Sequence, residues 1–250
     1  MHTLYKLILQ DQEEKKIMEF IDVTHGCEGF IDLLNYRDNS KNIINTPLEL
    51  CISRRYYDAA LKILENNYNE FIDNCVIIWE TIISFGCCTQ EEYEKGKKFL
   101  CTILKYQDPE YVNNYREPVI GNPIFDAVRI KNHEILGIML KFGCKTEIMI
   151  KGLTPLMYAI IYGNQGHIEI LVSYCADIMA ETKFGDNDVQ PYGVPFIIPN
   201  GINSIQLAKM YVDYYSEFAE HTENMKQNIE IEKKIKKYQQ IYDFLTTRWI

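Results

Sequence analysis

One pattern occurs three times in this chain and constrains its fold more than any other feature. The segments "TPLELCISRRYYDAALKILENNYN", "NPIFDAVRIKNHEILGIMLKFGCK" and "TPLMYAIIYGNQGHIEILVSYCAD" span residues 46–69, 122–145 and 154–177 and align without a gap. Each begins with Thr-Pro or Asn-Pro, places a small residue four positions after the proline, and ends in a second apolar stretch. A chain that repeats such a unit is predicted to stack the copies side by side.

Each position of the repeated unit has a physical role in a helix–turn–helix. Proline at the first position of a helix lacks only an N–H group that has no helical partner there, and the Thr or Asn before it caps the helix. The small residue, which is Cys51, Ala127 or Ala159, lets a neighbouring helix approach closely. The second stretch has apolar residues at helical spacing. Asn67 and Gly143 suit the left-handed residue that ends such a helix.

Three further stretches repeat the pattern in a weaker form. "GINSIQLAKMY" has Ser204 where the other units have proline. A second helix pair is predicted from "VIIWETIISF" and "GKKFLCTILKYQDP", which flank the insertion "GCCTQEEYEK". A third is predicted near the N-terminus, from "HTLYKLIL" and "EKKIMEFIDV". The charged segment "IEIEKKIKKYQQIYDFLTTRWI" suits a cap, because the ends of a stacked array face water. We therefore expect about six helix pairs.

The repeated unit resembles the ankyrin repeat. The Thr-Pro-Leu-His-x-Ala signature of that family corresponds here to "TPLELC", "NPIFDA" and "TPLMYA", with Glu49, Phe125 and Met157 in place of the histidine. The resemblance covers most of the chain, with 178–200 and 217–230 as departures. It implies an all-α ankyrin-repeat solenoid whose concave face and loop tips bind a protein partner.

The repeats predict a single ankyrin-repeat-like domain over residues 1–250. Its predicted parts are an N-terminal capping unit at 1–34, repeats at 35–70, 71–110, 111–146 and 147–178, an inserted loop at 179–200, and a C-terminal unit with its capping helix at 201–250. The inserted loop contains "KFGDNDVQPYGVPFIIPNG", which is rich in proline, glycine and apolar residues. Long ordered loops in compact proteins are often functional.

Two surfaces are candidates for binding a partner. In the ankyrin family, variable residues at the end of each first helix face the groove, and the resemblance assigns this position to Arg54, Phe85, Ile130, Tyr162 and Tyr211. One position earlier, the aligned residues are Ser53, Arg129 and Ile161. Aromatic residues and arginine are common at interface hot spots, so exposed Tyr162 and Tyr211 are expected to matter for binding more than for stability.

The inserted loop is the second candidate surface, through Tyr192 and Phe196. A structural alternative stays open for each surface. Phe85 and Ile130 could instead pack against the next repeat, and the loop could fold back to cover its own repeat.

No motif for catalysis, cofactors or metals stands out. The phosphate-binding, dinucleotide-binding, zinc-protease and nucleophile-elbow patterns are absent from the sequence. Cys87 and Cys88 are adjacent rather than spaced as zinc ligands, and the acidic loop at 186–188 lacks the glycine and closing glutamate of a calcium loop. His133 and His167 are expected at surface or helix-capping positions. We therefore expect no enzyme activity, no cofactor and no metal.

Charge and hydropathy exclude further classes of partner. A formal net charge of -9 disfavours nucleic acid, and no apolar run approaches the ~20 residues that span a bilayer. Neither a membrane nor a small-molecule ligand is an expected partner. The predicted function is non-catalytic binding of a protein whose identity the sequence does not give. The alternatives are a constitutive structural subunit of a larger assembly and an enzyme with an unrecognised site.

The cysteines indicate a reducing compartment. Most of the eight lie within apolar periodic segments, where a thiol behaves as a small buried hydrophobe. The N-terminal stretch turns polar after Gln10, which is not typical of a secretory signal. We expect a cytoplasmic protein with reduced cysteines, in the host cytoplasm if its source is a virus or an intracellular pathogen.

Overall fold

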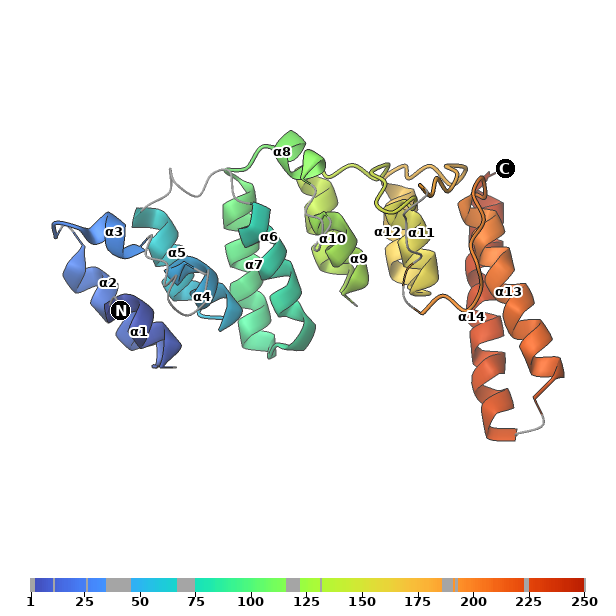
Figure 1. Cartoon of the computed structure of the whole chain (residues 1–250), viewed down its shortest axis with the longest axis horizontal. Helices are drawn as coiled ribbons and strands as arrows, with labels where there is room; N and C mark the ends of the chain where they lie inside the picture. The colour runs from blue at the N-terminus through green and yellow to red at the C-terminus, as the bar shows by residue number, and fades with distance from the viewer. Residues whose placement is uncertain are drawn as a thin grey trace. The chain divides into compact units, whose positions relative to one another are not determined.

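The computed structural model describes residues 3–10, 12–25, 27–34, 46–66, 75–115, 122–130, 132–185, 191, 193–222 and 225–249. Within these ranges the secondary structure is helical (Figure 1). The sole β-type contact in them is an isolated bridge between Ile150 and Leu153. The prediction of an all-α fold is therefore confirmed. The chain divides into two compact units, Met1–Arg116 and Glu117–Ile250.

Three helix pairs form the first unit. The pairs are α1 (Thr3–Leu9) with α2 (Glu14–Thr24), α4 (Pro47–Ser53) with α5 (Tyr57–Asn66), and α6 (Cys75–Ser84) with α7 (Gln90–Leu104). The shorter elements are α3 (Phe30–Leu34), η3 (Phe85–Cys87) and α8 (Pro109–Asn114). The first helix of the middle pair, α4, contacts α1 and α6, while α5 contacts α2 and α7. The unit therefore has one layer of first helices and one layer of second helices.

The second unit has the same organisation. Its pairs are α9 (Pro123–Arg129) with α10 (His133–Phe142), α11 (Pro155–Ile161) with α12 (Gln165–Ser173), and α13 (Ser204–Glu220) with α14 (Met225–Trp249). In this unit α11 contacts both α9 and α13, and α12 contacts α10. Together the two units contain six helix pairs in the part of the chain that the structure describes, in agreement with the expected number.

The first helices begin where the sequence predicts. The hydroxyl groups of Thr46 and Thr154 accept hydrogen bonds from the backbone N–H of the third residue of α4 and α11, Glu49 and Met157, both at 3.3 Å. In α4 the carboxylate of Glu49, which occupies the place of the signature histidine, accepts a hydrogen bond from the backbone N–H of Thr46 at 2.6 Å. This reciprocal pair is a capping box, so Glu49 supports the start of the helix without the histidine.

The small residues of the first helices lie in the core, as expected. Cys51, Ala127 and Ala159 are each 0% exposed. A larger side chain at any of the three positions would push the neighbouring first helix away. Their burial explains how helices of only seven residues stack in a layer.

Polar contacts join neighbouring second helices in the first unit. At the start of α2, the Glu14 carboxylate accepts hydrogen bonds from the backbone N–H groups of Asp58 and Ala59, at 2.8 and 3.1 Å. It thereby caps α5, a helix of the next pair. The Lys95 ammonium of α7 lies 3.0 Å from the Asp58 carboxylate and 4.0 Å from that of Glu14. Burial raises the pKa of Glu14, and the backbone N–H groups that bind the carboxylate oppose this effect.

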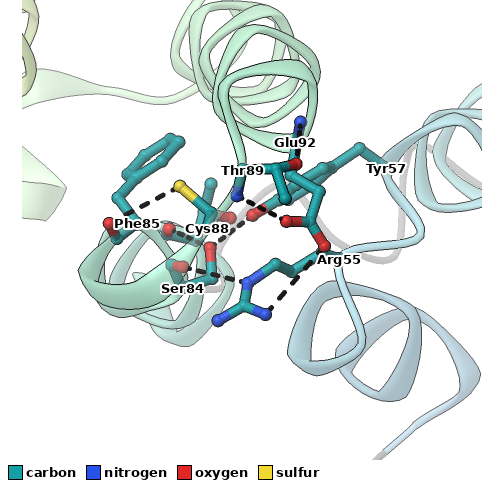
Figure 2. A network of polar contacts seen from close by, with 8 residues as sticks. Arg55, Tyr57, Ser84, Phe85, Cys88, Thr89 and Glu92 are labelled. Carbon is teal, nitrogen blue, oxygen red and sulfur yellow. Dashed lines mark hydrogen bonds and ion pairs between the residues drawn. The ribbon is translucent and has the colours of Figure 1, made fainter.

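A second polar network fixes the turn between α4 and α5 (Figure 2). Arg55 has a left-handed backbone, with φ of 62°, at the position that Gly163 occupies in the repeat at 154–177. Its guanidinium donates to the Ser84 carbonyl at 3.2 Å and lies 4.0 Å from the Glu92 carboxylate. The hydroxyl groups of Tyr57 and Ser84 are hydrogen-bonded to each other. The turn is therefore tied to the ends of α6 and α7, and these bonds offset the backbone strain of Arg55.

His167 is buried, contrary to the expectation of a surface or capping position. It is the third residue of α12 and is 0% exposed, whereas His133 is exposed as expected. The Asn164 side chain caps the helix instead, by accepting the His167 backbone N–H at 3.3 Å. In the alignment of the repeats, His167 corresponds to the buried Ile135. Burial lowers the pKa of His167, and the backbone of Asn132 opposes part of that shift.

Two helical glycines are predicted to respond in opposite ways to Gly→Ala substitution. A Cβ atom on Gly96 would lie 2.7 Å from the Phe85 ring and 2.8 Å from the Tyr57 ring, while one on Gly137 would meet nothing within 4 Å. Gly96→Ala is expected to destabilise the protein by about 1–3 kcal/mol through overpacking. Gly137→Ala is expected to stabilise it by about 0.5–1 kcal/mol through helix propensity. Denaturant unfolding of both variants measures the contrast, and equal effects would contradict the packing described around Gly96.

Stability is predicted to depend on pH through His167. Because its folded-state pKa lies below the ordinary value of 6.5, its contribution is present above that pH and is lost as the pH falls. The melting temperature of the wild type is therefore expected to drop between about pH 7.5 and about pH 5 more steeply than that of His167→Ile. His221→Ile, which changes an exposed histidine of the same unit, is the control. Parallel curves for wild type and His167→Ile would show that the buried imidazole is not responsible.

Candidate partner-binding surface

The two candidate residues of the first unit take part in packing. The Arg54 guanidinium donates to the Leu9 carbonyl at 3.1 Å, so this half-buried side chain binds the end of α1. Phe85 is 8% exposed, and its ring lies 5.4 Å from that of Tyr93. The structure thus favours the packing alternative for Phe85.

Of the candidates that the structure describes in the second unit, Tyr162 has the largest exposed fraction. It follows the last residue of α11 and is 41% exposed, while Ile130, after the last residue of α9, is half-buried. Burial of part of its ring raises the pKa of Tyr162, so the phenol is neutral at physiological pH. The loop candidate Phe196 is half-buried, and Tyr192 lies outside the described residues.

Tyr211 is 2% exposed, so the expectation that it lies at the surface is wrong. Its ring stacks on that of Tyr238 in α14, with centroids 4.3 Å apart and an interplanar angle of 7°. The Phe196 ring meets it edge-on at 4.7 Å. Burial raises the pKa of both Tyr211 and Tyr238. These rings form the core between α13, α14 and the inserted loop.

The inserted loop folds back on its own unit, and its base is closed by hydrogen bonds. The backbone N–H of Thr182 donates to the Ile202 carbonyl at 2.9 Å, and that of Gly201 donates to the Thr182 carbonyl at 3.0 Å. The Thr182 hydroxyl donates to the Pro199 carbonyl at 2.7 Å. Ile198 is 1% exposed and Ile197 is 83% exposed. Among the large apolar side chains described in this loop, that of Ile197 is therefore the most exposed.

A hollow of about 490 Å³ adjoins Tyr162. Its walls come from three places: Arg129 at the end of α9, residues 162–166 at the turn after α11 and the start of α12, and Lys237 of α14. Gly163, with φ of 60°, lacks a side chain where a Cβ atom would lie 2.4 Å from Cε of Lys237. The glycine thus allows Lys237 to lie across the turn, where its ammonium is 3.5 Å from the Tyr162 carbonyl.

A row of aromatic rings on α9 and α11 extends to this hollow. The Phe125 and Tyr158 rings meet edge-on at 5.1 Å, and the Tyr158 and Tyr162 rings are 6.3 Å apart. The exposure of these side chains increases from Phe125 at 8% to Tyr162 at 41%, with Tyr158 half-buried. We call Arg129, Ile130, Tyr158, Tyr162 and Lys237 the α11 surface.

Part of the α11 surface is predictable from the sequence. The alignment placed Ile130 and Tyr162 at groove positions and Arg129 one position earlier. The sequence predicts that Tyr158 lies in a first helix, but it does not predict that the side chain is exposed. Lys237 lies in a charged helix far along the chain, and only the tertiary fold brings it to Gly163.

No metal-binding group of three or more His, Cys, Asp or Glu side chains occurs among the residues that the structure describes. In the same ranges, no helix is both long enough and apolar enough to cross a membrane. Most side chains of the α11 surface are charged or aromatic. Such side chains recognise a partner by ion pairing and ring contact.

Known proteins share this architecture. Residues 151–183 match the family model of the ankyrin repeat. Among solved structures, the chain is similar to the crystal structure of EF0377, an ankyrin repeat protein, at 18% sequence identity and a TM-score of 0.53; the match covers 83% of this chain and 90% of that one. No curated protein sequence matches the chain. The structural likeness confirms the predicted solenoid fold.

The two tyrosines are predicted to differ in their effect on stability. Tyr211→Ala removes a stacked, buried ring and is expected to lower the free energy of unfolding by about 3–5 kcal/mol. Tyr162→Ala truncates a half-exposed ring and is expected to change it by less than about 1 kcal/mol. Denaturant unfolding monitored by circular dichroism measures both values. A large loss for Tyr162→Ala would show that its ring is part of the core.

Proposed function

Because this chain carries an ankyrin repeat at residues 151–183 and has the fold of an ankyrin-repeat solenoid, we propose that it is a non-catalytic module that binds a protein partner. Ankyrin repeats are generally protein–protein interaction modules, and stacked repeats offer an extended surface for this purpose. The proposed binding site is the α11 surface in the second unit. Ile197, at the exposed side of the inserted loop, is the proposed second contact.

The observation that carries this proposal is the position of Tyr162. Its ring is 41% exposed, it borders the hollow, and the rings of Tyr158 and Phe125 lie behind it. An exposed tyrosine on a rigid aromatic base provides contact area at a small cost in side-chain entropy. Tyr211 and Phe85 do not belong to the proposed site, because packing already buries their rings.

Selection of short random peptides displayed on phage, with the full chain as bait, tests the proposal. Peptides enriched on the wild type are expected to bind Tyr162→Ala at least tenfold more weakly, which corresponds to about 1.4 kcal/mol. Tyr174→Ala is the matched control, because Tyr174 is also an exposed tyrosine of the second unit, at 38%, and does not line the hollow. The melting temperatures of both variants establish that the fold is retained.

The same selection distinguishes the two proposed contacts. Ile197→Ser changes the most exposed large apolar side chain among the described residues of the loop and leaves the Phe196 and Tyr211 rings in place. If the selected peptides bind Tyr162→Ala normally and lose affinity for Ile197→Ser, the loop is the principal site. Equal loss in Tyr162→Ala and Tyr174→Ala would contradict a local site at the α11 surface.

A further inference from the structure

The first helix of the last pair, α13, is much longer than the first helices before it. α9 and α11 have seven residues each, whereas α13 has 17. In the alignment of the repeats Tyr211 corresponds to Tyr162, which follows the last residue of α11, so residues 212–220 extend beyond the length of a first helix. This extension packs along α14, where the Tyr215 ring stacks on that of Tyr238 (Figure 1). The stacking of repeats does not require it.

Two aromatic rings form an exposed pair on this extension. The rings of Tyr214 and Phe218 are nearly parallel, with an interplanar angle of 10° and centroids 6.2 Å apart. Tyr214 is half-buried, and the rings of Tyr215 and Phe196 lie against it, at 5.2 and 5.8 Å. Phe218 is 48% exposed, a larger fraction than the 41% of Tyr162. The extension therefore presents to water an aromatic side chain that rests on packed rings.

Two carboxylates accompany these rings near the end of α13. Glu217 is three residues after Tyr214, and Glu220 is three residues after Glu217, so each lies next to the one before it on the helix surface. Both are exposed, and neither forms an ion pair in the part of the chain that the structure describes. Asp213, by contrast, is paired with Lys209. The charges of Glu217 and Glu220 are therefore not neutralised within the described ranges.

The position of these carboxylates is unfavourable for the helix itself. The C-terminal end of a helix has a partial negative charge that favours cations, and like charges three residues apart repel each other. The last turn of α13 nonetheless contains no basic residue. A cation bound at this end would offset both effects. The exposed rings and the charge beside them together match a positively charged ligand.

The same aromatic cluster already holds a cation from within the chain. The Lys234 ammonium of α14 lies 4.9 Å from the centre of the Tyr215 ring, within the range of a cation–π contact. Lys234 forms no ion pair with Glu217 or Glu220, so it leaves their charge in place. The exposed ring of Phe218 offers the corresponding contact to a cation from outside, with a carboxylate next to it in the helix.

We propose that Tyr214, Glu217, Phe218 and Glu220, which we call the α13 end surface, bind an arginine side chain in a linear segment of the protein partner. The guanidinium lies over the Phe218 ring and donates hydrogen bonds to the neighbouring carboxylates, a combination that its planar shape allows. Through the Phe196 ring, which lies against Tyr214, this surface adjoins the loop contact proposed above. The inference rests on the proposed function and adds a second surface with its own charge preference.

Two synthetic peptide pools with random flanks test the charge requirement on the full chain. Their fixed centres are Arg-Leu-Leu-Arg and citrulline-Leu-Leu-citrulline, which differ in charge but hardly in shape, and biolayer interferometry measures their binding. The wild type is expected to bind the arginine pool about fivefold or more tightly than the citrulline pool. This preference should shrink between about 50 mM and about 500 mM NaCl, because salt screens exposed ion pairs.

Variants of the α13 end surface locate the preference. Glu217→Gln, Glu220→Gln and Phe218→Leu are each expected to weaken binding of the arginine pool about threefold, with little change for the citrulline pool. Neither glutamine variant should lower the melting temperature, because both remove a negative charge from the C-terminal end of the helix. Glu181→Gln is the matched control. Glu181 is exposed and lies beside Gly201 at the start of α13, the other end of a helix about 25 Å long.

Each remaining outcome counts against the inference in a distinct way. Equal binding of the two pools overturns the arginine contact but leaves the proposed function standing. Equal losses in Glu181→Gln and Glu217→Gln show a diffuse attraction to an acidic chain, and loss of the preference in Tyr162→Ala assigns it to the α11 surface instead. A dimer seen by light scattering without peptide, and abolished by Glu217→Gln, assigns the surface to a second copy of this chain. Absence of binding to both pools, with no peptide enriched from the phage library, counts against the proposed function as well.

Discussion

A helix of seven residues is not stable by itself in water, and the whole structure depends on how its neighbours compensate. Each of α4, α9 and α11 has this length and buries most of its residues. Two local features hold such a helix in place. Capping side chains provide hydrogen-bond acceptors for the first N–H groups, and a small buried residue allows the next first helix to pack closely. Stability therefore belongs to the stack rather than to any one pair.

The local features of this fold could be predicted because they depend on residues close in sequence. The spacing within one repeat predicts that a first helix begins at proline, that Thr46 and Thr154 cap it, and that Ala127 and Ala159 are buried. Asn203 likewise caps α13 at the position that the degenerate repeat predicts. The resemblance to ankyrin repeats predicts that the pairs stack in chain order as a solenoid, and the likeness to the solved ankyrin repeat structure supports this fold.

The sequence-based predictions fail where residues far apart in sequence come into contact. Tyr211 aligns with exposed groove positions, but α14 and the inserted loop cover it, and an alignment of repeats contains no information on either. His167 is polar, yet it occupies a position that another repeat fills with Ile135, and its neighbours bury it. Lys237 is one of four lysines in the charged segment, and the sequence does not distinguish them. Which of its lysines meets Gly163 depends on how α14 packs.

The last helix pair has a consequence for the way such an array can be rearranged. Tyr238 donates a hydrogen bond to the Ile161 carbonyl at 3.1 Å, and Lys237 beside it lies over Gly163. The α14 helix that packs on Tyr211 is therefore also one wall of the hollow. Repeat proteins are commonly engineered by exchanging whole modules for generic ones. In this chain an exchange of the α13–α14 pair would remove Lys237 and Tyr238 together, and with them one wall of the hollow and a contact to α11.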